Sequence, residues 1–265
     1  MKLGLIHYRA PGDTVEEFLT WAAETGFENV ELMWPDLMPE GRDDPAANTA
    51  EVKQVADDLG IEITAVSLGN DFVQLDDAVI ADQVERMKGI ADLMLMCDCH
   101  IFRTEGGQPK DSVPEDQHAA AIIKSVEAAL PACEEMDMYL AIDNHGVVSN
   151  DNAVLMAVLE HFKHPRVGTN LDTMNYRWFG YEVDELPAIY EAVAPYVLST
   201  HIKDGRNARP DYIGATLGEG EVPLNSAVAS LKAAGFEGPW HAECEADEDF
   251  GVAYSKCLDW MKANI

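Results

Sequence analysis

The sequence predicts an α/β protein, folded as a single (β/α)8 barrel domain over residues 1–265. Short apolar segments typical of strands alternate with segments of helical spacing, and the alternation occurs eight times. The chain length suits one barrel, since such barrels need roughly 250 residues. Doubly wound sheets usually have fewer units and often a glycine-rich turn after the first strand, and this sequence has no such turn.

The expected strands are short, apolar and bounded by turn residues. The first, LGLIH, is followed by Pro-Gly, and the third, IEITAVS, follows Gly60. The eight strands are expected at residues 3–7, 29–33, 61–67, 99–104, 138–145, 166–172, 196–203 and 239–245.

The expected helices show apolar residues at helical spacing together with start and stop signals. Asp13 or Thr14 caps the first helix, Val15 and Phe18 lie on its apolar face, and Gly26 ends it. The later helices are expected at residues 45–59, 76–96, 115–136, 151–163, 184–195, 224–234 and 249–263.

The charge balance excludes several classes of partner. The chain has 48 acidic and 18 basic residues and a formal net charge of −30, which repels nucleic acid and anionic membrane surfaces. The five cysteines, an odd number, favour a reducing compartment. The start of the sequence lacks a signal-peptide core, and no apolar run is long enough to span a membrane. We therefore expect a cytoplasmic protein with a small-molecule partner, and assembly into a homo-oligomer stays open.

Four consecutive expected strands end in residues that can bind metal: Asp143, Asp172, His201 and Glu243. The active site of such a barrel lies at this end of the strands. Three converging carboxylates would repel one another unless a cation joins them. Three oxygens and one imidazole nitrogen suit one divalent ion, for which we predict Mn²⁺, with Mg²⁺, Co²⁺ and Zn²⁺ as alternatives.

Several motifs give the chain a family resemblance. They are GFENVEL at 26–32, AIDNHG at 141–146, VGTNLDTMN at 167–175, HIKDG at 201–205, LGEGEV at 217–222 and GPWHAECE at 238–245. With these motifs the chain resembles the xylose-isomerase-like TIM-barrel family of sugar phosphate isomerases and epimerases, which includes ketose 3-epimerases. The resemblance implies a metal held by Asp143, Asp172, His201 and Glu243, with the first and last of these as the catalytic acid/base pair.

Two positions depart from the family pattern. Asp143 stands where the family usually has Glu, and Asn175 stands where many members have His. Asn carries no proton at neutral pH. His145, two residues after Asp143, is therefore a third candidate catalytic residue, as a replacement base.

Five residues are predicted to bind substrate. Lys203 shares a strand face with His201 and could polarise a substrate oxygen, although a role as counter-ion to Glu243 or Glu245 fits equally well. Glu31 resembles a family glutamate at the end of the second strand, and it either bonds substrate or orients a ligand. The complete set is Lys203, Glu31, Asn175, Arg103 and Arg206.

The expected chemistry starts from a divalent ion that binds a carbonyl and an adjacent hydroxyl and stabilises an enediolate. Returning the proton gives isomerisation or epimerisation of a free sugar or keto-sugar. Expelling a β-substituent instead makes the protein a lyase, either a dehydratase or a deglycosidase of a 3-keto-glycoside. A non-catalytic sugar-binding protein is a further alternative. Five carboxylates between Glu243 and Asp249 predict an uncharged substrate, since they repel a phosphate ester.

Overall fold

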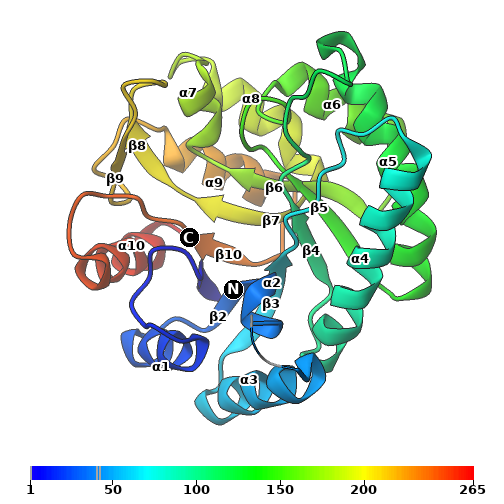
Figure 1. Ribbon diagram of the computed structural model, residues 1–265. Coiled ribbons are helices and arrows are strands. Elements are labelled where there is room, and N and C mark those ends of the chain that lie inside the picture. Colours follow the sequence, from blue (N-terminus) through cyan, green and yellow to red (C-terminus); the bar gives the residue numbers. More distant parts are fainter. Residues whose placement is uncertain (1, 40, 42) are drawn as a thin grey trace.

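The computed structural model describes residues 2–39, 41 and 43–265. Eight strands, each parallel to its neighbours, close into a barrel in the order β1-β10-β7-β6-β5-β4-β3-β2. Helices surround these strands (Figure 1). The predicted (β/α)8 fold is confirmed. The barrel strands are β1 (Leu3–Ile6), β2 (Asn29–Met33), β3 (Glu62–Ser67), β4 (Ile101–Thr104), β5 (Tyr139–Asp143), β6 (Val167–Asp172), β7 (Val197–Ile202) and β10 (Trp240–Ala242).

The main helices follow the strands as the sequence predicts, and their ends match the expected signals. The Thr14 side chain accepts a hydrogen bond from the Glu17 backbone N–H at 3.2 Å, and Gly26 ends that helix with a φ of 101°. The helices are α1 (Val15–Thr25), α2 (Trp34–Leu37), α3 (Pro45–Leu59), α4 (Asp77–Met96), α5 (His118–Glu135), α6 (Asn152–Phe162), α7 (Asn175–Phe179), α8 (Leu186–Val193), α9 (Leu224–Ala233) and α10 (Phe250–Asn264), with 3₁₀ turns at Glu115–Gln117 and Ala194–Tyr196.

Four strands end earlier than predicted, and two of them, β5 and β10, end earlier by two or more residues. The last strand pairs with its neighbours only over Trp240–Ala242, so Glu243 lies just beyond it. Likewise β5 ends at Asp143, which places His145 in the following loop. The strands stop here because the chain leaves the barrel and its backbone groups find other partners; the His145 N–H, for example, donates to the Ser149 hydroxyl.

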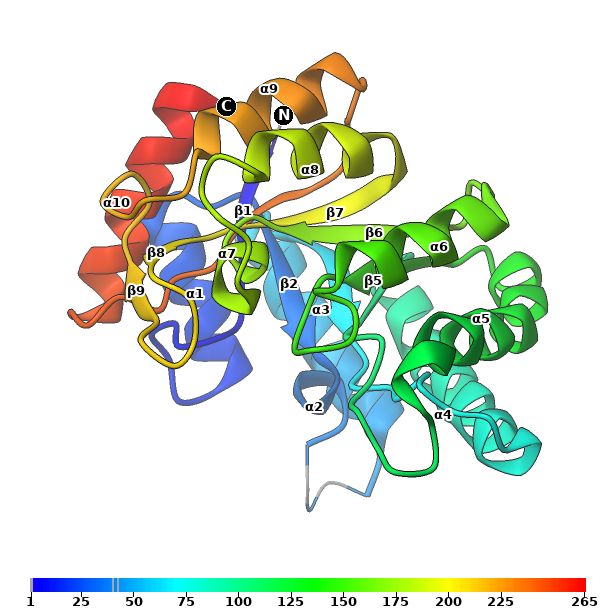
Figure 2. The same ribbon diagram turned by 90° about the horizontal axis from the view of Figure 1, so that it is seen from above.

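The loop after β7 forms a small hairpin that the sequence did not predict. Its strands are β8 (Asp204–Arg206) and β9 (Ile213–Ala215), on the side of the barrel near α7 and α10 (Figures 1 and 2). The buried Asp204 carboxylate accepts backbone N–H bonds from Gly205, Gly218, Gly220 and Val222 at 2.8–3.2 Å. A Cβ at Gly220 would come within 2.0 Å of this carboxylate, so glycine is required there. Asp204 therefore fixes the loop at the mouth of the barrel.

The apolar core lies between the barrel and its helices. The last helix, α10, contacts both β1 and β10, so the two ends of the chain meet on one side of the barrel (Figure 2). All five cysteines are free and buried. Within the described ranges, none of the helices has the length and apolarity needed to cross a membrane.

Candidate metal centre

The four predicted metal ligands come from the carboxyl ends of neighbouring strands. Asp143 ends β5, Asp172 ends β6, His201 lies near the end of β7, and Glu243 directly follows β10. Asp172 is paired in register with His201. All four residues are buried, with Glu243 the most exposed at 8%.

Three of the four predicted ligands come together. Ligand atoms of Asp172, His201 and Glu243 lie within 4.8 Å of one another. His201 Nδ1 lies 2.9 Å from Glu243 Oε2, yet this nitrogen and Asp172 Oδ2 are buried atoms without a hydrogen-bond partner. Buried polar atoms normally have partners. Three ligand atoms this close together, two of them without a hydrogen bond, fit a divalent cation.

The two oxygens of Asp172 have different surroundings. Oδ1 accepts the backbone N–H groups of Met174 and Asn175 at 2.8 and 2.9 Å, which fixes the carboxylate. Oδ2 has no hydrogen bond, and burial raises the pKa of Asp172 to about 7. A metal ion at Oδ2 would offset this penalty because it stabilises the charged carboxylate.

Asp143 lies outside this group of ligands. Its Oδ2 accepts a hydrogen bond from Arg103 Nη1 at 2.7 Å, and its Oδ1 accepts one from Asn170 Nδ2 at 2.9 Å. Both carboxylate oxygens are therefore held by side chains of the adjacent strands β4 and β6. Asp143 is not among the three residues whose ligand atoms lie within 4.8 Å of one another, and the buried guanidinium of Arg103 supplies its counter-charge.

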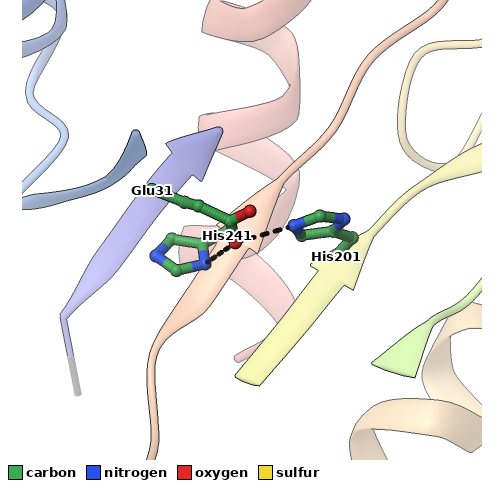
Figure 3. Close-up of side chains that lie close together, drawn as sticks. All are labelled: Glu31, His201 and His241. Atoms are coloured by element: carbon green, nitrogen blue, oxygen red, sulfur yellow. Dashed lines mark hydrogen bonds and ion pairs between the residues drawn. The ribbon is translucent and has the colours of Figure 1, made fainter. Parts of the chain in front are cut away.

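Glu31 stands behind His201 and away from the cavity. Its carboxylate is fully buried, with Oε2 2.9 Å from His201 Nε2 and 3.7 Å from His241 Nδ1 (Figure 3). Burial would raise the pKa of Glu31, but Arg103 and His201 lower it to about 2. A histidine that binds metal commonly directs its second ring nitrogen at a carboxylate. Of the two roles predicted for Glu31, the structure supports the orientation of a ligand, since a fully buried carboxylate cannot reach substrate.

Glu31, His201 and His241 also offer three ligand atoms within 4.8 Å. The guanidinium group of Arg103 already forms an ion pair with the other carboxylate oxygen of Glu31, Oε1. Burial lowers the pKa of His241 to about 4, and its Nε2 lies 2.8 Å from the Thr64 hydroxyl. In this trio Glu31 Oε2 and His201 Nε2 already bond to each other, whereas Asp172 Oδ2 and His201 Nδ1 have no hydrogen bond. We therefore interpret this trio as support for His201.

Lys203 places a positive charge among the carboxylates. Its Nζ lies 2.7 Å from Glu243 Oε1, 3.3 Å from Glu245 Oε2 and 3.8 Å from Asp172 Oδ2. Burial alone would lower the pKa of Lys203, but these carboxylates hold it well above its ordinary value. Lys203 also lines the adjacent cavity, so both of its predicted roles, substrate contact and counter-ion, are compatible with its position.

A cavity of about 480 Å³ opens beside the ligand group, a size typical of small-molecule sites. His145 and Asn175, both predicted site residues, line it. His145 Nδ1 lies 3.7 Å from Asp143 Oδ2, and Asn175 Nδ2 donates to the Asn144 carbonyl at 2.9 Å. The complete lining is Arg9, His145, Gly146, Asn175, Trp178, Lys203, Tyr212, Gly214 and Glu245.

A larger cavity, of about 680 Å³, lies at the opposite end of the barrel. It opens beside Glu62, Ile101 and Tyr139, which are the first residues of β3, β4 and β5. The metal ligands lie at the other ends of the strands. We place the candidate site at the smaller cavity because the orphaned ligand atoms are there.

Besides Glu31, two further predicted substrate residues, Arg103 and Arg206, do not line the cavity. Arg103 is only 4% exposed, and all three of its guanidinium nitrogens donate to protein side chains. Arg206 is exposed and donates to the Glu219 carbonyl. Neither residue lines the cavity. In the acidic chain both guanidinium groups find protein acceptors instead.

The polar side chains of Arg9 and Tyr212 also line the cavity, although the sequence did not predict them there. Arg9 follows β1, and Tyr212 lies in the turn of the β8–β9 hairpin, where its hydroxyl donates to Glu245 Oε2 at 2.6 Å. Neither residue belongs to a motif or a periodic pattern. Two carboxylates in the expected repulsive run point elsewhere, since Glu248 pairs with Lys256 and Asp249 caps α10. Fewer carboxylates than predicted are therefore placed to repel a phosphate ester.

Comparisons with known proteins agree with the fold. A family model described as a xylose isomerase-like TIM barrel matches residues 19–264. No curated protein matches the sequence. A solved structure of D-psicose 3-epimerase with D-tagatose, from Clostridium cellulolyticum H10, is 15% identical and has a TM-score of 0.80, over 100% of this chain and 99% of that one.

Two further solved structures share the fold. The IOLI protein with a binding zinc atom is 15% identical with a TM-score of 0.81, over 99% of this chain and 97% of that one. A protein described as the probable 3-DHS dehydratase AsbF, involved in petrobactin synthesis in Bacillus anthracis, is 17% identical with a TM-score of 0.78, over 99% of both chains. At these identities, the likeness establishes the fold alone.

Proposed function

Because the chain belongs to the xylose isomerase-like TIM barrel family, we propose that it is an enzyme: a divalent-metal-dependent isomerase or epimerase of a free sugar or keto-sugar. The observation that carries this proposal is the meeting of Asp172, His201 and Glu243 beside a cavity large enough for a sugar. The fold shared with D-psicose 3-epimerase supports it.

The proposed ligands of the metal are Asp172, His201 and Glu243, with Mn²⁺ as the proposed ion and Mg²⁺, Co²⁺ or Zn²⁺ as alternatives. When bound, such an ion supplies a Lewis acid that polarises a carbonyl and stabilises an enediolate. The orphaned atoms Asp172 Oδ2 and His201 Nδ1 support a cation at this position. The zinc atom in the IOLI structure supports a metal in this fold.

Two groups of the chain are placed to move protons. Burial would raise the pKa of Glu243, but Lys203 and His201 hold it well below its usual range, so the carboxylate is charged and can accept a proton. His145 lines the cavity from the loop after β5 and offers a second base. A proton taken by one group and returned from the other gives the epimer, and return to the neighbouring carbon gives the isomer. Lys203, which is protonated, can donate a hydrogen bond to a substrate oxygen.

The surroundings of His145 favour a second candidate function, a lyase. An imidazole beside a fixed carboxylate is a common general base. If the enediolate loses a β-substituent before the proton returns, the same residues support a dehydratase or a deglycosidase of a 3-keto-glycoside. The fold shared with a dehydratase supports this alternative.

The two functions give different products. Protein stripped of metal and reloaded with Mn²⁺ is incubated in D₂O with D-psicose, D-tagatose, D-fructose and a 3-keto-glucoside. An isomerase or epimerase returns a ketose or aldose that carries deuterium at the reacting carbon. A lyase instead releases a dehydrated sugar or a free aglycone. Metal-free protein and the Glu243→Gln variant are the controls.

A third outcome would refute both functions. Protein that binds sugars with unchanged affinity after metal removal and converts none would be a sugar-binding protein. We also propose that the protein acts in the cytoplasm on small molecules rather than on nucleic acid. The five free cysteines and the net charge of −30 support this.

A further inference from the structure

Arg103 connects both halves of the candidate site, although it does not line the cavity beside the proposed metal ligands. It lies on β4 inside the barrel, and each of its three guanidinium nitrogens has its own acceptor. Nε donates to Glu31 Oε1, Nη1 to Asp143 Oδ2 at 2.7 Å, and Nη2 to the Ser67 hydroxyl at 2.8 Å. One planar group therefore bridges side chains from β2, β3 and β5.

The first branch of this network leads to the metal ligands. Glu31 accepts a hydrogen bond from Arg103 Nε through Oε1, and its other oxygen, Oε2, lies 2.9 Å from His201 Nε2. That contact aims the opposite ring nitrogen, His201 Nδ1, at Asp172 and Glu243. If Glu31 rotated, the imidazole would lose the contact that fixes its plane. Partners of this kind usually change metal affinity by about 10- to 100-fold.

The second branch leads to the candidate base. Asp143 is held through Oδ2 by Arg103 and through Oδ1 by Asn170. The same Oδ2 lies 3.7 Å from His145 Nδ1, and the ring lines the cavity. This separation is an ion-pair distance, and catalytic contacts commonly shorten when substrate binds. Asp143 is thus placed to orient His145, as the carboxylate of a catalytic triad orients its histidine.

We infer that Arg103 is a positioning residue whose single guanidinium sets both the metal ligand His201, through Glu31, and the base His145, through Asp143. This inference rests on the proposed function for the roles of the two histidines. It assigns Asp143 to the base rather than to the metal. It also explains why a fully buried arginine lies beneath an active-site cavity that it does not enter.

A simpler role for Arg103 would be charge balance alone. Two buried carboxylates without a cation would be costly, and any cation would relieve that cost. Charge balance and positioning can be distinguished by replacing Arg103 with lysine. Lysine keeps the charge, but its single ammonium cannot reproduce a planar fork that serves acceptors on three strands. The Arg103→Lys variant should therefore still neutralise the two buried carboxylates but no longer position them.

The test compares Arg103→Lys with wild-type protein and with Arg166→Lys. Arg166 pairs with Asp137 at the amino-terminal end of the barrel, so it is a matched control for the exchange. Mn²⁺ affinity is measured by calorimetry, and kcat and KM are measured on the best keto-sugar substrate. If Arg103 positions His201 and His145, Arg103→Lys should weaken Mn²⁺ binding at least tenfold. At saturating Mn²⁺ it lowers kcat at least 30-fold and changes KM less than threefold. Arg166→Lys should change each quantity less than twofold.

Single-branch variants check that the two effects are separate. Glu31→Gln should weaken Mn²⁺ binding, with a smaller loss of kcat once metal is saturating. Asp143→Asn should lower kcat while Mn²⁺ affinity stays within threefold. Wild-type values of both quantities in Arg103→Lys would overturn the inference. So would a loss of Mn²⁺ affinity in Asp143→Asn as large as in Asp172→Asn.

Histidine NMR supplies a readout that needs neither metal nor turnover. In metal-free protein with ¹⁵N-labelled histidine, Arg103→Lys should shift the ring resonances of His145 and His201, whereas Arg166→Lys should not. Shifted rings in a protein that binds no metal would refute the proposed function while upholding the positioning role. Unshifted rings would refute the positioning role alone. If Arg103→Lys does not fold, Arg103→Ala is used, and 5–20 mM guanidinium ion should restore the ring shifts and part of kcat, whereas the same concentration of sodium ion should not.

Discussion

Asp172 and His201 are paired in register on β6 and β7, and each has one buried atom, Oδ2 and Nδ1, that could bind a metal and has no hydrogen bond. Nearly all buried polar atoms in proteins have partners. In this molecule two exceptions meet within reach of Glu243. A cation bound by these residues, as we propose, would give both atoms a partner.

Asp172→Asn should therefore remove the metal site, whereas Asp143→Asn should leave it. The first substitution removes Asp172 Oδ2, a buried carboxylate oxygen without a hydrogen bond. The second alters a carboxylate that already accepts hydrogen bonds from Arg103 and Asn170. Metal content after dialysis, measured by mass spectrometry, should be about one ion per chain in wild type and in Asp143→Asn. It should be less than a tenth of that in Asp172→Asn. Equal loss in both variants would make Asp143 a ligand.

Mn²⁺ affinity should rise with pH. Burial alone would lower the pKa of His201, but Glu31 and Glu243 raise it to about 10, so Nδ1 carries a proton that a metal ion must displace. Below that pH, affinity should fall about tenfold for each pH unit lowered. Burial raises the pKa of Asp172 to about 7, which steepens the fall below that pH.

Calorimetry between pH 6.5 and 8.5, in buffers of different ionisation enthalpy, counts the protons released on binding. About one proton should be released at pH 8 and more at pH 6.5. An affinity that does not change across this range would contradict the protonated state of His201.

Glu243→Gln should abolish turnover without unfolding the protein. The amide keeps the shape of the side chain but cannot accept a proton. The bond from Lys203 Nζ at 2.7 Å, which needs only an oxygen acceptor, can persist. We expect kcat to fall at least 100-fold while the unfolding temperature changes little. Glu248→Gln is the matched control, because Glu248 belongs to the same segment but pairs with Lys256 outside the cavity. Near-normal kcat in metal-loaded Glu243→Gln would move the catalytic role to Asp143 or His145.

Asp204→Ala should destabilise the fold. The change leaves four backbone N–H groups, those of Gly205, Gly218, Gly220 and Val222, without their shared acceptor. Water can reach part of this loop, so we expect a loss of roughly 2–4 kcal/mol in the free energy of unfolding. Urea unfolding measures it, with Asp211→Ala in the same loop as control. A change below about 1 kcal/mol would show that the carboxylate is not the anchor of the loop.

The sequence by itself predicted the barrel and the end of the barrel where the site lies. Strand and helix periodicity, and stop signals such as Gly26, are local properties that neighbouring residues set. The placement of Asp172, His201 and Glu243 also follows from local pattern. A polar residue that ends an apolar parallel strand must lie at the same edge as the ends of the adjacent strands. In the structure, ligand atoms of these three residues lie within 4.8 Å of one another.

Only the tertiary structure decided which of these polar residues contact one another. Arg103 and Asp143 lie on adjacent strands but 40 residues apart, and Glu31 reaches His201 across 170 residues. Alternation shows that these side chains point inward, but their partners depend on side-chain length, strand stagger and the competition of a few cations for many carboxylates. That competition pairs Arg103 with Glu31 and Asp143, and its side chain does not line the cavity. Arg9 and Tyr212 reach the cavity through loops whose path is set by long-range contacts such as those of Asp204, so no local pattern could have found them.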